Sequence, residues 1–140
     1  MITCERYHDF SYGHSVWGHE SVCARIHGHN GRVTLTCIQE AGGLDSIGRV
    51  IDFGVIKSTL CEWIEDNWDH KTLLWENDPR LARMQEIDPT VVSLPFNPTA
   101  EGLANHLLFV VGPGLLVHSG VRLIKVRFDE TRKCSATVQL

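Results

Sequence analysis

The sequence lacks a long apolar run and has no excess of basic residues. Its 13 Lys and Arg against 17 Asp and Glu give a net charge of −4, which does not favour nucleic-acid binding. A membrane-spanning helix needs about 20 apolar residues in succession. Residues 1–10 are polar and lack the apolar run of a signal peptide. We therefore expect a cytoplasmic protein with neither a membrane nor a nucleic-acid partner.

No Cys-x-x-Cys pair occurs among the five cysteines, which are odd in number and widely spaced. This pattern indicates reduced thiols and not a disulfide framework. Repeats, low-complexity segments and linkers are also absent. With 140 residues, of which 43% are hydrophobic, the chain can bury a sizeable core, and we expect one domain over residues 1–140.

The patterning of apolar residues predicts five strands. Alternation of apolar and polar residues indicates strands over residues 5–14, 31–40, 49–52, 120–131 and 135–140. A turn-rich segment separates the second strand from the third, so these two form a candidate hairpin.

Two segments follow the helical period instead. The first covers residues 52–68, with Asp52 as its N-cap. The second covers residues 97–114, where Asn97 caps the helix and Gly112-Pro113-Gly114 ends it. Together, the elements predict an α+β fold, in which an antiparallel sheet carries helices on one face.

Histidine is plentiful, with eight residues, and two lie one residue apart. His27 and His29 would share one face of a strand because side chains alternate along it. Two imidazoles cannot fill a tetrahedral site, so a third ligand is needed, and His14 on the neighbouring strand is the best candidate. Catalytic zinc keeps a fourth position open. Alternatively, a His-x-His pair arises by chance in a histidine-rich chain.

Cys23 lies four residues before His27, in a polar segment. A nearby cation favours the thiolate, which can act as nucleophile or base. The alternative is a small buried hydrophobe, which is what most free cysteines are. The other four cysteines are expected to be of that second kind.

Two further acidic positions are candidates for chemistry. Asp69 and His70 follow the first predicted helix, where a carboxylate–imidazole contact could support proton transfer; the alternative is a histidine that favours the helix dipole. Glu130 shares parity with Ile124, Val126 and Phe128, so its carboxylate would end an apolar row and need a partner. A ligand with adjacent N–H donors could supply that partner, unless the strand end is simply solvated.

Six segments together resemble the pterin synthases of the tunnelling fold, which include the 6-pyruvoyl- and 6-carboxy-tetrahydropterin synthases. The resemblance extends from about residue 5 to the C-terminus. The segments are SYGH, CARIHGHN, GRVIDFGVIK, WDHKTL, NPTAEGLA and FDET.

Within this family, the Cys-x3-His-x-His spacing of Cys23, His27 and His29 is similar to that of the 6-carboxy-tetrahydropterin synthases. The pyruvoyl enzymes place the cysteine further from the first histidine, and a folate-linked branch has glutamate in its place. The resemblance implies conversion of 7,8-dihydroneopterin triphosphate to 6-carboxy-5,6,7,8-tetrahydropterin, with release of acetaldehyde and triphosphate, in 7-deazaguanine and queuosine biosynthesis.

The resemblance also implies roles for individual residues. Cys23 would be the general base, Asp69 and His70 a second acid–base unit, and Glu130 the anchor of the pterin through a bidentate contact. The implied Zn²⁺ ligands are His14, His27 and His29.

The family architecture implies a four-stranded antiparallel sheet with two helices on one face, in subunits that join into a barrel. Two trimers would stack as a homohexamer, with active sites between subunits. The chain departs from compact bacterial members by a longer segment over residues 76–96. Alternative functions are a 6-pyruvoyl-type activity, a non-catalytic zinc- and pterin-binding protein, or an unrelated three-histidine zinc hydrolase.

Overall fold

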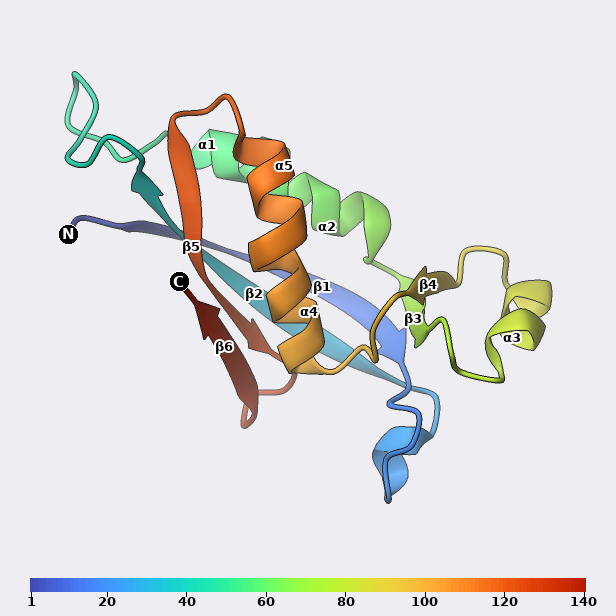
Figure 1. The fold of residues 1–140 in the computed structure, drawn as a ribbon. Helices are drawn as coiled ribbons and strands as arrows, with labels where there is room; N and C mark the ends of the chain where they lie inside the picture. Colours follow the sequence, from blue (N-terminus) through green and yellow to red (C-terminus); the bar gives the residue numbers. More distant parts are fainter.

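The computed structural model describes residues 1–140 and consists of one curved sheet with helices packed on it (Figure 1). The sheet has six strands in the order β4-β3-β1-β2-β5-β6. The strands are β1 (Cys4–His14), β2 (His27–Gln39), β3 (Lys71–Trp75), β4 (Val92–Leu94), β5 (Val121–Asp129) and β6 (Ser135–Gln139).

Two long helical segments cover one face of this sheet, and both are interrupted by a π turn. The first comprises α1 (Phe53–Ile56), a π turn (Lys57–Cys61) and α2 (Glu62–Asn67). The second comprises α4 (Ala100–His106), a π turn (Leu107–Val111) and α5 (Gly112–Leu116). In Figure 1, α4 and α5 lie in front of the strands, and α1 and α2 lie beside them and farther back.

Two smaller elements project from the end of the sheet opposite the chain termini (Figure 1). One is the loop over residues 15–26, which joins β1 to β2 and contains a 3-10 turn (Val22–Ala24). The other is α3 (Leu81–Ile87), within the long segment between β3 and β4. None of the helices has the length and apolar character that a membrane span requires.

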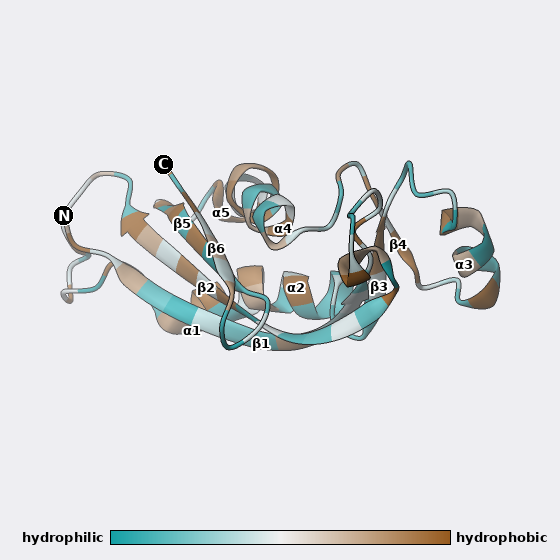
Figure 2. Cartoon of the chain, turned by 90° about the horizontal axis from the view of Figure 1, so that it is seen from below, coloured by the Kyte–Doolittle hydropathy of each residue, from teal (hydrophilic) through white to brown (hydrophobic).

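The core lies between the helices and one face of the sheet. A single cluster of 23 buried residues includes Val33, Leu35 and Phe128 from the strands and Ile56 and Leu103 from the helices. Brown and teal segments alternate along α2 and α4 in Figure 2, as expected of helices with one apolar side. The opposite face of the sheet carries no helix and is polar.

The α+β class with helices on one face is confirmed, but the predicted sheet is wrong in detail. Six strands are present instead of four, and β3 pairs in parallel with both β1 and β4. Residues 49–52 form no strand and instead lead into α1. Just before them, Asp45 accepts hydrogen bonds from the backbone N–H groups of Ile47 and Arg49. Local turn chemistry outweighs the short apolar run in this segment.

The helix boundaries agree with the sequence at one end and differ at the other. Asp52 caps α1 as predicted, because its side chain accepts from the Gly54 N–H at 2.7 Å. Thr99, and not Asn97, caps α4. The Gly-Pro-Gly segment does not end the helix, because the π turn before it leaves Pro113 in the first turn of α5, where its missing N–H is harmless. A Cβ at Gly112 would lie 2.7 Å from Leu123 Cδ2, so a larger residue here would have to displace the Leu123 side chain of β5.

A register shift in β5 changes one predicted face. Val126 and Phe128 are fully buried as expected, but Leu123 is buried in place of Ile124. The pairing with β2 shifts between Thr36 and Cys37, which leaves an extra residue on β5. Such a bulge inverts the alternation on one side of it.

Candidate metal centre and active site

Three histidines converge at the ends of the paired strands β1 and β2. In the antiparallel register, His14 lies opposite His27, and Tyr12 lies opposite His29, so all four side chains share the helix-covered face. One ligand atom from each of the three imidazoles lies within 4.8 Å of the other two. The nearest pair is His14 Nε2 and His27 Nε2, at 3.1 Å. The convergence expected from the spacing is thus confirmed, and the cluster could hold a metal.

Backbone carbonyl groups fix the orientation of two of these rings. His14 Nδ1 donates to the Pro98 carbonyl at 2.7 Å, and His27 Nδ1 donates to the Arg25 carbonyl at 2.6 Å. With Nδ1 occupied, each ring directs Nε2 towards the centre of the cluster. Metal-binding histidines commonly use the second ring nitrogen in this way.

The electrostatics of the cluster also suit a metal. His29 Nε2 is buried without a hydrogen-bond partner, and its contact with Glu130 Oε1 at 3.2 Å lacks hydrogen-bond geometry. Burial lowers the pKa of His14 to about 4 and also lowers the pKa of His29. All metal-binding imidazoles must be neutral. Three imidazoles around one point, two of them with lowered pKa values and one unpartnered, are the kind of donor set that could hold a metal.

Tyr12 is a member of this site that sequence reasoning did not single out. Its ring contacts His14 edge-on at a centroid distance of 5.2 Å, and its hydroxyl is buried without a hydrogen-bond partner. Burial, with a further contribution from the Glu130 carboxylate, raises the pKa of the Tyr12 hydroxyl. The sequence did offer a signal for Tyr12: it lies two residues before His14 on the same strand, so both side chains are expected on the same face.

Glu130 follows the last residue of β5 on the side of the sheet that carries the histidines. Its side chain is about one quarter exposed (24%), and it lies next to His29. The apolar row before it is present at Val126 and Phe128. The carboxylate therefore ends a buried row beside the histidine cluster, as the sequence indicated.

Cys23 lies in the 3-10 turn of the loop over residues 15–26 and is half-buried. It is not one of the clustered ligands. Its carbonyl accepts from the Val16 N–H at 2.9 Å, and this bond closes the loop on itself. All five cysteines are free. Cys37 and Cys61 are buried as expected, but Cys134 is exposed, because it follows the turn between β5 and β6.

The residues before α4 tie the loop and the histidine cluster together. The Asn97 side chain accepts from the Trp17 N–H and donates to the Trp17 carbonyl, at 3.2 and 2.8 Å. Pro98 holds His14, and Thr99 caps the helix by accepting from the Gly102 N–H at 3.0 Å. The Asn-Pro-Thr segment thus contacts three parts of the molecule, which explains why Asn97 is not the cap.

Asp69 and His70 lie in a different environment. Asp69 Oδ1 accepts from the Ser11 N–H at 3.0 Å, and Oδ2 contacts His70 Nδ1 at 2.7 Å. Burial opposes ionisation of Asp69, but these bonds outweigh it and lower its pKa. His70 has φ of 56°, in the left-handed region, where non-glycine residues often mark functional sites. The predicted carboxylate–imidazole contact is therefore present.

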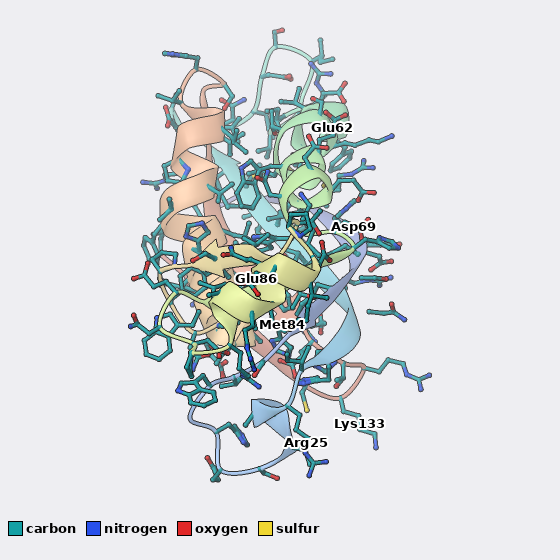
Figure 3. The ribbon with its side chains drawn as sticks, turned by 90° about the vertical axis from the view of Figure 1, so that its right-hand side faces the viewer. Arg25, Glu62, Asp69, Met84, Glu86 and Lys133 are labelled. Atoms are coloured by element: carbon teal, nitrogen blue, oxygen red, sulfur yellow. The ribbon has the colours of Figure 1, made fainter.

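This pair faces the open side of the sheet. The His70 side chain is 80% exposed and borders a cavity of about 1060 Å³, of whose 16 lining residues only one is hydrophobic. Figure 3 shows Asp69 on the side of the molecule away from α4 and α5. One copy of the chain thus places the acid–base pair and the histidine cluster on opposite faces of one sheet.

Comparison with known proteins agrees with this geometry. The sequence profile of the 6-pyruvoyl tetrahydropterin synthase family matches residues 3–140. A Rickettsia felis protein named 6-carboxy-5,6,7,8-tetrahydropterin synthase is 34% identical over 140 residues, covering 99% of this chain and all of that protein. A Haemophilus influenzae protein of the same name is 26% identical over 115 residues, covering 76% and 79% of the two chains.

Solved structures share the fold at lower identity. An uncharacterized protein of Wolinella succinogenes has a TM-score of 0.82 at 23% identity, covering 99% of this chain and 97% of that one. The 6-pyruvoyl tetrahydropterin synthase of Caenorhabditis elegans has a TM-score of 0.71 at 21% identity, covering 99% and 95%. The family match spans nearly the whole chain, and a full-length relative exceeds 30% identity. The chain therefore belongs to the 6-pyruvoyl tetrahydropterin synthase family of enzymes.

Proposed function

We propose that this protein is a zinc-dependent 6-carboxy-tetrahydropterin synthase, with residues 1–140 as its single domain. It would convert 7,8-dihydroneopterin triphosphate to 6-carboxy-5,6,7,8-tetrahydropterin, acetaldehyde and triphosphate, in 7-deazaguanine and queuosine biosynthesis. The observation that carries the proposal is the convergence of three imidazoles, one without a partner, in a chain whose full-length relatives have this name.

The ligands of the metal would be His14, His27 and His29, through the nitrogens that point to a common centre. Zinc bound there would polarise the side-chain oxygens of the substrate as a Lewis acid and acidify the neighbouring C–H bonds. Cys23, as thiolate, would accept a proton from the acidified carbon. Glu130 would bind the paired N–H donors of the pterin, a charge-assisted contact that suits a half-buried carboxylate.

Asp69 and His70 would form the second acid–base unit, at a site completed by another copy of the chain. Their place on the open face supports this, since a side chain cannot cross a hydrogen-bonded sheet to reach the histidine cluster of its own copy. Exposed sheet edges at β4 and β6 also favour closure of several copies into a barrel. We propose a homohexamer made of two trimers.

The polar end of the molecule offers cations for the triphosphate. Figure 3 shows Arg25, on the loop over residues 15–26, and Lys133, after β5, extending into solvent at the same end of the chain. Neither side chain makes an ion pair within the chain, so both are free to bind phosphate oxygens.

A second candidate is 6-pyruvoyl-tetrahydropterin synthase activity, because the matched family and the Caenorhabditis elegans structure have that name. The Cys-x3-His-x-His spacing and the names of the full-length relatives favour the carboxy product. The two reactions differ in their products, so product identity decides between them.

The test is incubation of the purified protein with 7,8-dihydroneopterin triphosphate, with and without a zinc chelator, followed by product analysis by mass. We expect 6-carboxy-tetrahydropterin and acetaldehyde, and loss of both with the chelator. Cys23→Ala should remove turnover with zinc still bound, and Cys134→Ala, the exposed control, should not. A pyruvoyl product without acetaldehyde would overturn the carboxy assignment, and full activity of Cys23→Ala would overturn the role of the thiol.

A further inference from the structure

The loop that contains Cys23 has little apolar anchoring. Its large hydrophobic residues Trp17, Val22 and Ile26 are 41%, 60% and 41% exposed. A segment that buries little apolar surface opens at low free energy unless polar contacts fix it. The position of Cys23 therefore depends on the few hydrogen bonds that connect this loop to the rest of the chain.

One guanidinium group supplies the bonds on one side of the loop. Arg80, which immediately precedes α3, donates from Nη1 to the Ala24 carbonyl at 2.9 Å and from Nη2 to the Ser15 hydroxyl. The Ser15 hydroxyl itself donates to the same Ala24 carbonyl at 2.8 Å. The charged group also lies over the Trp17 ring, 4.9 Å from its centroid. Arg80 thus contacts both ends of the loop and the Trp17 ring.

A buried carboxylate holds this guanidinium in place. Asp78 accepts from Arg80 Nε at 2.9 Å and from Nη2 at 2.7 Å, and it also accepts from the Arg80 backbone N–H at 2.9 Å. The Asp78 side chain is completely buried. Burial opposes its ionisation, but the bonds from Arg80 outweigh it, and the pKa of Asp78 is lowered. A bidentate pair of this kind fixes the planar fork in one orientation, which lysine cannot reproduce.

The bonded carbonyl belongs to the residue next to Cys23, and the adjacent residue supports a histidine. Ala24 follows Cys23 in the 3-10 turn, and the Arg25 carbonyl orients His27 through Nδ1. Asp78 and Arg80 lie in the segment 76–96, which contains α3 and β4. In Figure 1 α3 and the loop project from the same end of the sheet.

We propose that the Asp78–Arg80 pair is a positioning unit that sets where Cys23 lies relative to the histidine cluster. This inference rests on the proposed function, because it assigns the position of the thiol a role in turnover. Neither residue is one of the proposed metal-binding, catalytic or pterin-binding residues. Since a misplacement of about 1 Å can cost about 100-fold in rate, loosening the loop should lower kcat and leave KM and zinc content nearly unchanged.

The test compares Arg80→Ala, Arg80→Lys and Asp78→Asn with Arg83→Ala, which changes an exposed arginine of α3 without a side-chain bond. One readout is hydrogen exchange of the peptide 15–26, and a second is the alkylation rate of Cys23, with exposed Cys134 as internal reference. Neither needs enzymatic turnover. The third is kcat and KM with 7,8-dihydroneopterin triphosphate, with zinc content measured in parallel.

For Arg80→Ala we expect faster exchange over residues 15–26, altered alkylation of Cys23, and kcat lower by about 10- to 100-fold with KM within about threefold. Arg80→Lys should restore little, and Arg83→Ala should match the unaltered protein. Asp78→Asn keeps the shape of the Asp78 side chain but removes its charge. It replaces Arg80→Ala in these measurements if Arg80→Ala fails to fold.

Unchanged exchange and unchanged kcat would overturn the proposal, as would faster exchange with full kcat. A fall in kcat that comes only with loss of zinc would also overturn it. If the unaltered protein makes no pterin product, the proposed function fails, while exchange and alkylation still report whether the pair holds the loop.

Discussion

The two faces of the sheet differ in their exposure to water, and each carries a different part of the proposed site. On the helix-covered face, His14 is 1% exposed, and the strand residues around it are buried. On the open face, charged residues form exposed pairs across or along strands, such as Asp9 with Arg32 at 2.7 Å and Asp129 with Arg127 at 2.9 Å. Each strand therefore has buried side chains on the helix-covered face, called the dry face below, and exposed side chains on the open face, called the wet face.

This difference decides which groups suit a metal and which suit proton exchange with solvent. Burial lowers the pKa values of His14 and His29 on the dry face, which favours the neutral form that a metal requires of its ligands. On the wet face, His70 is exposed and contacts the Asp69 carboxylate, whose pKa is lowered. The sheet separates the two groups, so the proposed site needs a second copy of the chain to bring them together at one substrate.

The largest expected effect is on activity when two inactive variants are mixed. Cys23→Ala and His70→Ala should each be nearly inactive. Co-expressed in equal amounts with two affinity tags, they should recover about a quarter of normal activity, because that fraction of randomly assembled sites combines two intact groups. Mixed oligomers are isolated by sequential purification and assayed for product.

The control for this mixing experiment is co-expression of Cys23→Ala with a Cys23→Ala, His70→Ala double variant, which provides no intact thiol. Absence of recovery from verified mixed oligomers would show that both groups act within one copy, contrary to the separation of the two faces.

A second prediction compares neighbouring residues on the two faces of β5. Phe128 is completely buried, whereas the Arg127 side chain is 54% exposed and pairs with Asp129. Phe128→Ala should lower the free energy of unfolding by about 3–5 kcal/mol through the cavity that it leaves. Arg127→Ala should cost less than about 1 kcal/mol, because exposed ion pairs contribute little. Denaturant unfolding at constant pH measures both, and similar losses would contradict the assignment of the faces.

A third prediction concerns acid stability of the metal-free protein. The pKa of His14 is about 4 in the folded state, against about 6.5 unfolded, so the unfolded chain binds more protons between these values. The contribution of His14 is fully present above about pH 6.5 and is lost as the pH falls towards 4. The loss is on the order of 3 kcal/mol.

This pH dependence is measured by denaturant unfolding at a series of pH values in the presence of a chelator. His14→Gln should flatten the profile between pH 4 and 6.5, and His118→Gln, at an exposed position, should not. An unchanged profile for His14→Gln would show that this imidazole titrates as if it were exposed.

The sequence predicts most of the site because its residues lie on regular strands. Alternation fixes the faces of His14, His27 and His29, and the cross-strand register brings them together. It also indicates the row that ends at Glu130. The parity rule fails at Ile124, where a bulge adds one residue.

What the sequence does not predict depends on contacts between distant segments. The parallel strands β3 and β4 need partners that local patterning cannot identify. Asn97 resembles a cap by its position, but it bonds Trp17, 80 residues away in the chain. Asp78 and Arg80 lie in a segment without a motif, and their role emerges only from the folded loop that they contact.

The Asn-Pro-Thr segment has a consequence for how the centre is coupled to the fold. Three successive residues hold the Cys23 loop, orient His14 and close the first turn of α4, so a movement at one of these contacts displaces the other two. A ligand that binds only the folded histidine cluster stabilises the folded state of the segments that contact this cluster. Fraying of α4 should therefore slow when metal is bound, and the backbone amide of Gly102, which touches no imidazole, becomes a reporter of occupancy.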